Sequence, residues 1–157
     1  MTPGTEINAP SKLCLGELAK NMIIELLTAA DEKNIELALV NKTDAKIIGN
    51  SSAISILLRN LIDNAIRYSP KNSLVSIEIT SSDNQVILAV SDQGPGIPNE
   101  LKERVFERFF RVLGNNTKGS GLGLGIVKEI VDFHNAKIKL LDANPGLVVQ
   151  IRFEKHR

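Results

Sequence analysis

The stretch VSDQGPGIP, residues 90–98, places an aspartate at the end of an apolar run and follows it with Gly-Pro-Gly. Asp92 has the same strand parity as Leu88 and Val90, so its carboxylate points inward if that face of the strand is buried. Two glycines around a proline are typical of a tight turn or of a close backbone approach. The stretch therefore predicts a strand that ends in a turn at Gly94 and Gly96.

The segments on either side of this turn predict an α+β fold. Alternating or continuous apolar runs predict strands at 35–40, 45–49, 74–80, 85–90, 137–141 and 147–153. Helical periodicity occurs at 11–33, 51–69, 99–110 and 122–135, whereas 111–121 has no period and predicts a mobile loop. Helices and strands do not alternate regularly, which favours helices covering one face of a mixed, mostly antiparallel sheet.

Length and composition fit one domain, residues 11–157, preceded by a polar and disordered N-terminal segment at residues 1–10. The net charge of +1 provides no overall basic surface for nucleic acid. The single cysteine, Cys14, excludes an internal disulfide, and no apolar run approaches the length of a membrane span.

Glycines are concentrated in one quarter of the chain, because seven of the eleven lie between Gly94 and Gly125. The segment KGSGLGLGIVKEI, residues 118–130, has a glycine-rich start that feeds a helix, which is an arrangement suited to phosphate. A Walker loop and a dinucleotide fingerprint are both excluded by the spacing of these glycines.

Asn60, Asn64 and Arg67 stand at i, i+4 and i+7 on one face of the helix predicted at 51–69. Amide oxygens suit Mg²⁺ and a guanidinium suits phosphate, while the alternative is a pair of amides on the helix surface. Tyr68 either stacks on a base or covers the rim of the core. Asp92 either accepts a bond from a purine amine or binds the N–H groups of its own turn.

Three phenylalanines and three arginines alternate within RVFERFFR, residues 104–111. The aromatic side chains predict an anchor that holds a neighbouring segment against the core. Arg111 or Lys118 could then reach a terminal phosphate, and a solvated charged face is the competing explanation.

Four stretches taken in order resemble the N box, first glycine box, F box and second glycine box of bacterial sensor histidine kinases. They are NLIDNAIRYSP (60–70), DQGPGIP (92–98), ERVFERFFRV (103–112) and GSGLGLGIV (119–127). The resemblance runs over nearly the whole chain. It implies the ATP-binding catalytic domain, with a Bergerat-type α/β sandwich and a mobile ATP lid.

The resemblance also assigns residues to the nucleotide. It places Asn64 and Asn60 at Mg²⁺, Arg67 at phosphate, Tyr68 over the adenine and Asp92 at the adenine amine. The remaining residues that it assigns to ATP are Gly94, Gly96 and Ile97 under the purine, and Arg111, Lys118, Gly119, Ser120, Gly121, Leu122, Gly123 and Leu124 in the lid. Family lids often have alanine where this chain has Gly125.

The family's phosphoacceptor histidine lies on a separate dimerisation domain, and neither His134 nor His156 occurs in an acceptor motif. The resemblance therefore implies no catalytic residue in this chain, with transfer of the γ-phosphoryl to that separate domain and onward to a response-regulator aspartate. It also implies a cytoplasmic domain of a bacterial inner-membrane protein, without direct membrane contact. The alternatives are a free-standing serine kinase of the anti-sigma-factor type and a non-catalytic ATP-sensing module.

Overall fold

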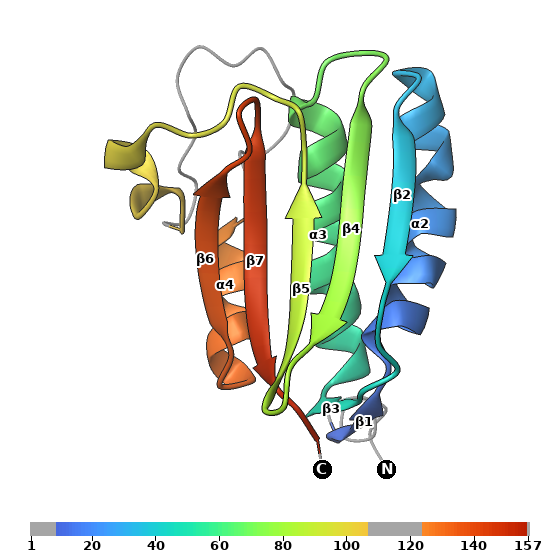
Figure 1. The fold of residues 1–157 in the computed structure, drawn as a ribbon, viewed down its shortest axis with the longest axis vertical. Coiled ribbons are helices and arrows are strands. Elements are labelled where there is room, and N and C mark those ends of the chain that lie inside the picture. Colours follow the sequence, from blue (N-terminus) through green and yellow to red (C-terminus); the bar gives the residue numbers. More distant parts are fainter. Residues whose placement is uncertain (1–8, 107–123, 157) are drawn as a thin grey trace.

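A five-stranded sheet in the order β2-β4-β5-β7-β6 forms one layer of the computed structural model, which describes residues 9–106 and 124–156 (Figure 1). Its strands are β2 (Glu36–Asn41), β4 (Leu74–Ser81), β5 (Gln85–Ser91), β6 (Lys137–Asp142) and β7 (Leu147–Glu154). The β2–β4 pair is parallel and the other three pairs are antiparallel. This arrangement confirms the predicted mixed, mostly antiparallel sheet.

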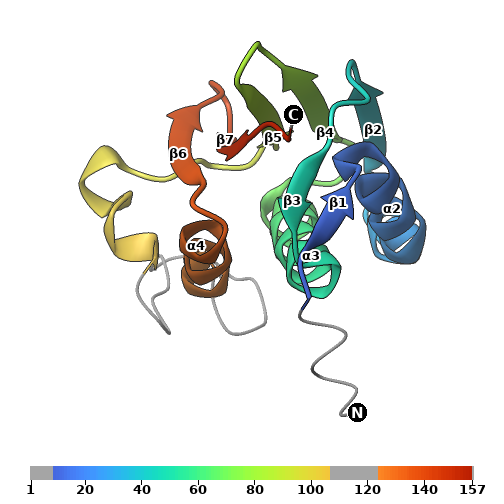
Figure 2. The same cartoon turned by 90° about the horizontal axis from the view of Figure 1, so that it is seen from below.

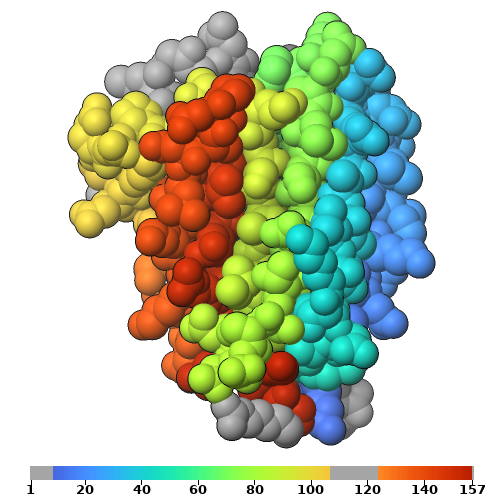
Figure 3. Space-filling model, viewed as in Figure 1, coloured from blue at the N-terminus to red at the C-terminus, as the bar shows by residue number. Residues whose placement is uncertain are grey.

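The second layer consists of α2 (Leu15–Glu32), α3 (Ser51–Tyr68) and α4 (Leu124–Phe133). All three helices lie on the same face of the sheet, as predicted, and Figure 2 shows the two layers from below. The short strands β1 (Ser11–Leu13) and β3 (Ile47–Gly49) pair at the end of the molecule where α2 and α3 begin. Figure 3 shows the opposite face of the sheet, on which none of the helices α2, α3 and α4 lies.

The core lies between the two layers because the strands alternate between buried and partly exposed residues. The buried sheet residues on the three central strands are Val75, Ile77, Ile79, Val86, Leu88, Val90, Leu147, Val149, Ile151 and Phe153. Helix α3 places Ile54, Leu58 and Leu61 against them at helical spacing. Because Asp92 continues the inward parity of Val90, the fold carries its carboxylate toward the helix layer.

Two of the predicted helices differ from the structure. The helix predicted at 11–33 begins only at Leu15, because Ser11–Leu13 pairs with β3 as a strand. The described part of the helix predicted at 99–110 is not an α-helix but two short 3-10 turns, Asn99–Leu101 and Arg104–Phe106. Their backbone N–H groups bond to the carbonyl oxygen three residues earlier. Phe109, the predicted mobile loop at 111–121 and most of the 1–10 segment lie outside the described residues.

His134, just after α4, is hydrogen-bonded to the residue just before α3. Its Nε2 accepts a hydrogen bond from the backbone N–H of Asn50 at 3.1 Å, and its Nδ1 lies 2.7 Å from the carbonyl oxygen of Ile130. Asn50 is in turn the N-cap of α3, since its side chain accepts from the N–H of Ala53. The two helices that flank the candidate site are therefore joined at the opposite end of the molecule.

Within the described ranges, none of the helices combines the length and the apolar character that a bilayer crossing requires.

Candidate functional site

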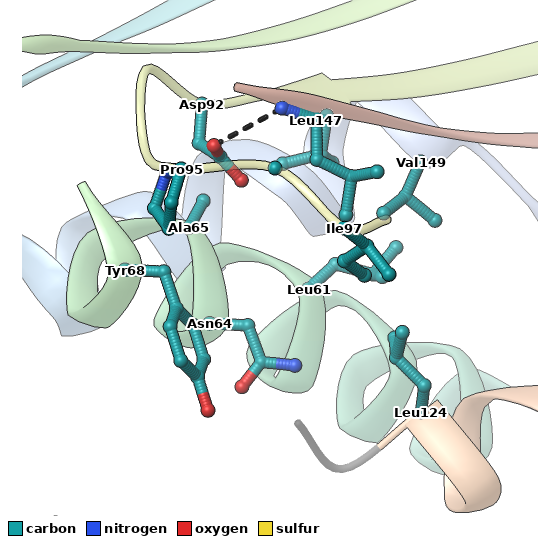
Figure 4. Close-up of a pocket in the computed structure, with 12 residues that line it drawn as sticks. Leu61, Asn64, Ala65, Tyr68, Asp92, Pro95, Ile97, Leu124, Leu147 and Val149 are labelled. Carbon is teal, nitrogen blue, oxygen red and sulfur yellow. Dashed lines mark hydrogen bonds between the residues drawn. The ribbon is translucent and has the colours of Figure 1, made fainter. Parts of the chain in front are cut away.

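A cavity lies between α3, the first residues of α4 and the ends of β5 and β7 (Figure 4). Six residues that the sequence analysis assigned to ATP line it: Asn64, Tyr68, Asp92, Gly96, Ile97 and Leu124. The rest of the described lining is mostly apolar and consists of Leu61, Ala65, Val90, Pro95, Leu147 and Val149. The arrangement is a mainly apolar pocket with a few polar groups, which is typical of a small-molecule site.

The carboxylate of Asp92 has one oxygen committed to the protein and one available. Oδ1 accepts the backbone N–H groups of Gly94 at 2.9 Å and Leu147 at 3.2 Å, while Oδ2 accepts no hydrogen bond from the described residues. Burial raises the pKa of Asp92 above its ordinary value, and the two backbone bonds lower it in part. The interpretation in which Asp92 binds its own turn is therefore confirmed. The bond to a purine amine stays a prediction, for which Oδ2 is an available acceptor.

The two glycines of the Gly-Pro-Gly stretch, Gly94 and Gly96, form the turn that the sequence predicted after Asp92. A Cβ added at Gly94 would lie 2.3 Å from the carbonyl oxygen of Tyr68, so the loop can approach the end of α3 only with glycine there. Gly96 has a φ of +75°, a conformation that other residues rarely adopt. The turn therefore brings Asp92 and Tyr68 to the same cavity.

Of the three residues predicted to share one face of α3, Asn64 lines the cavity, and Asn60 and Arg67 do not. The Nδ2 of Asn64 is buried and has no partner among the described residues. Asn60 donates its Nδ2 to the carbonyl oxygen of Ile56 at 2.8 Å, and the Nε of Arg67 donates to Asp63 at 2.9 Å. Asn60 and Arg67 lie beside the cavity on the same helix but do not line it.

These groups fit a nucleotide with its metal ion. The buried donor of Asn64 lacks an acceptor, which a phosphate oxygen or a metal-bound water would supply. The bond from Asn60 to Ile56 uses only the donor end of the amide, so its oxygen remains available as a hard ligand. The predicted residues Arg111, Lys118, Gly119, Ser120, Gly121, Leu122 and Gly123 lie outside the described residues.

Leu147 is a functional residue that the sequence analysis missed. Its backbone N–H binds Oδ1 of Asp92, its carbonyl oxygen accepts the N–H of Asp92 at 3.0 Å, and its side chain lines the cavity. The pattern of 137–153 predicted a hairpin between the strands at 137–141 and 147–153, which the structure confirms, but it did not predict that β5 is the second neighbour of β7. The pairing of Val149 with Val90, which brings Leu147 to Asp92, follows from the tertiary arrangement.

A family model described as "Histidine kinase-, DNA gyrase B-, and HSP90-like ATPase" matches residues 49–157. The chain belongs to this family. It is 35% identical over 137 residues to the sensor protein QseC of Salmonella typhi, and 42% identical over 121 residues to the sensor-like histidine kinase SenX3 of Mycobacterium tuberculosis. These alignments cover 87% and 75% of the chain but only 30% and 29% of the relatives' lengths.

Solved structures agree with this assignment. The catalytic domain of histidine kinase ThkA superposes with a TM-score of 0.84 at 30% identity, covering 93% of this chain and 97% of that one. The mycobacterial sensor histidine kinase MprB gives a TM-score of 0.83 at 30% identity, with the same coverage. ThkA in complex with the response regulator TrrA matches at 26% identity and a TM-score of 0.79, over 94% of this chain and 42% of that one. The fold is therefore that of a histidine kinase catalytic domain.

Proposed function

We propose that this chain binds Mg·ATP in the cavity between α3 and the Asp92 loop and donates the γ-phosphoryl group to a histidine on a separate dimerisation domain. The observation that carries the proposal is the free Oδ2 of Asp92 in a cavity that also contains Tyr68 and the unpartnered amide of Asn64. A carboxylate oxygen that faces an apolar slot is a suitable acceptor for the amine of adenine.

The residues of the chain contribute binding and orientation. Asp92 accepts from the base, Tyr68 and Ile97 enclose it, and Asn64 faces the phosphate end. The amide oxygens of Asn64 and Asn60 would hold Mg²⁺, which would neutralise phosphate charge when bound. Phosphoryl transfer depends mainly on positioning and charge, so a domain without an acceptor binds ATP with little turnover.

The acceptor lies outside this chain in the proposed mechanism. Both ring nitrogens of His134 are engaged, one by the N–H of Asn50 and one by the carbonyl oxygen of Ile130. The bond between the γ-phosphorus and the bridging oxygen of ADP breaks, and a P–N bond forms to an imidazole of the dimerisation domain. A response-regulator aspartate then receives the group. This two-component role places the chain in the cytoplasmic part of a bacterial membrane sensor.

Calorimetric titration of ATP tests the proposal directly. We expect binding to the unchanged chain that weakens without Mg²⁺ and in Asn64→Ala, followed by labelling of a relative's isolated dimerisation domain from [γ-³²P]ATP. Absence of ATP binding would contradict the proposal. Binding without transfer to any histidine would favour the ATP-sensing module, and transfer to a serine would favour the anti-sigma-factor type of kinase.

A further inference from the structure

The C-terminal end of α3, which carries Asn64 and Tyr68, is bonded to a lysine that directly follows α2. The last carbonyl groups of a helix have no partner within it and form the negative end of its dipole. Three carbonyl oxygens at this end accept hydrogen bonds from the Nζ of Lys33, namely those of Ile66 (2.8 Å), Arg67 (2.9 Å) and Ser69 (2.5 Å). An ammonium group has three donors, and all three are used here.

The position of Lys33 is itself fixed by bonds between two turns. The carbonyl oxygen of Lys33 accepts the backbone N–H of Asn72 at 3.0 Å. The side chain of Asn34 donates to the Oδ1 of Asn72 at 2.6 Å, and the N–H of Glu36 donates to the carbonyl oxygen of Ser73 at 3.0 Å. The turn after α2 and the turn after α3 are therefore joined, at the end of the molecule that holds the cavity (Figure 1).

Ser69 connects the same end of α3 to the loop of Asp92. The side chain is buried, with only 2% of the residue exposed. Its Oγ accepts the backbone N–H of Gln93 at 3.3 Å, and the Oε1 of Gln93 accepts the N–H of Leu74 at 2.8 Å. The residue after Asp92 is thus bound to the residue after Tyr68, so the two sides of the cavity are joined through Ser69.

We propose that Lys33 and Ser69 act as positioning residues for the nucleotide, a pair that we call the α3 clamp. Neither residue lines the cavity. Lys33 fixes the last turn of α3, and Ser69 fixes the spacing between that turn and Asp92. The clamp therefore sets how Asn64 and Tyr68 stand relative to the carboxylate. This inference rests on the proposed binding of ATP in the cavity.

The sequence provides a native probe of this spacing, because Tyr68 is the only tyrosine and the chain has no tryptophan. Tyrosine fluorescence of the intact chain therefore reports on one cavity residue. Lys33→Met removes all three bonds from Nζ while keeping an unbranched side chain. Ser69→Ala removes the Oγ that binds the loop. Lys42→Met is the matched control, since the side chain of Lys42 forms an exposed pair with Glu78 at 3.4 Å.

Lys33→Met loses three internal bonds and Ser69→Ala loses one. We expect each variant to raise the Kd for ATP about tenfold, because a displaced cavity side chain would lose about one hydrogen bond to the nucleotide. Both variants should change the Tyr68 emission of the free protein, and Lys42→Met should change neither quantity. Lys33→Arg should give an intermediate Kd, because a planar guanidinium restores the charge but cannot direct donors to three converging carbonyls.

The outcomes separate the clamp from the proposed function. If the unchanged chain does not bind ATP, the proposed function is wrong and the clamp fails with it. If the unchanged chain binds, and both variants unfold more easily yet keep the Kd and the Tyr68 emission, the two residues are only structural and the clamp alone is wrong. If Lys33→Met does not fold, Ser69→Ala and Lys33→Arg decide by the same two measurements.

Discussion

Replacing Asp92 with asparagine changes one atom of the cavity and tests the role of the carboxylate. The new Oδ1 can still accept the N–H groups of Gly94 and Leu147, which bind Oδ1 in the structure at 2.9 and 3.2 Å. The free Oδ2, which faces the cavity as an acceptor, becomes an amide donor. The loop therefore keeps its bonds, while the bond to the adenine amine is lost.

The expected size of the effect follows from that single bond. A hydrogen bond to a charged group contributes about 1.5 to 3 kcal/mol, so the Kd for ATP should rise about ten- to hundredfold. The free energy of unfolding of the ATP-free protein should not fall at neutral pH. Burial raises the pKa of Asp92, which means that the fold disfavours the charged form that asparagine removes.

Purine riboside triphosphate, which lacks the exocyclic amine, makes the assay specific for this bond. Calorimetric titrations of both nucleotides into both proteins form a double-mutant cycle. The unchanged chain should bind ATP about ten- to hundredfold more tightly than the analogue, and Asp92→Asn should lose that preference. An equal preference in the two proteins would refute the assignment of Asp92 to the amine, even if both affinities fell.

Gly94→Ala places a Cβ 2.3 Å from the carbonyl oxygen of Tyr68, so we expect a lower thermal midpoint and loss of ATP binding. A variant that binds ATP with normal affinity would contradict the need for this close approach. His134→Phe leaves the buried N–H of Asn50 without its acceptor and should lower the free energy of unfolding by about 1 to 3 kcal/mol in urea titrations, with an unchanged Kd for ATP. Because the pKa of Asp92 is raised, the folded state binds its proton more tightly than the unfolded state. The contribution of Asp92 to the free energy of unfolding should therefore decline as pH rises from 3.8 through the raised pKa. Urea midpoints measured against pH should show this decline, and Asp92→Asn should lack it.

The sequence by itself determined most of the local elements and the polar side chains that line the cavity, Asn64, Tyr68 and Asp92. Alternation predicted the inward face of Val86, Leu88 and Val90, and with it the inward direction of Asp92, because side chains in a strand alternate strictly. Helical spacing placed Asn64 and Tyr68 on one helix, and the structure brings both to the cavity with Asp92. These predictions succeeded because each depends on a short period within one segment.

Only the tertiary structure decided which distant residues complete the site. The N–H of Leu147 binds a carboxylate 55 positions earlier, and Lys33 binds carbonyl groups that follow it by 33 to 36 positions. Backbone donors and carbonyl acceptors are present at nearly every residue, so no pattern in the sequence distinguishes the ones that meet. Strand order and the packing of helices on the sheet select those partners. For this reason the motifs identified several residues that line the cavity, whereas the distant residues bonded to its walls became apparent only in the folded chain.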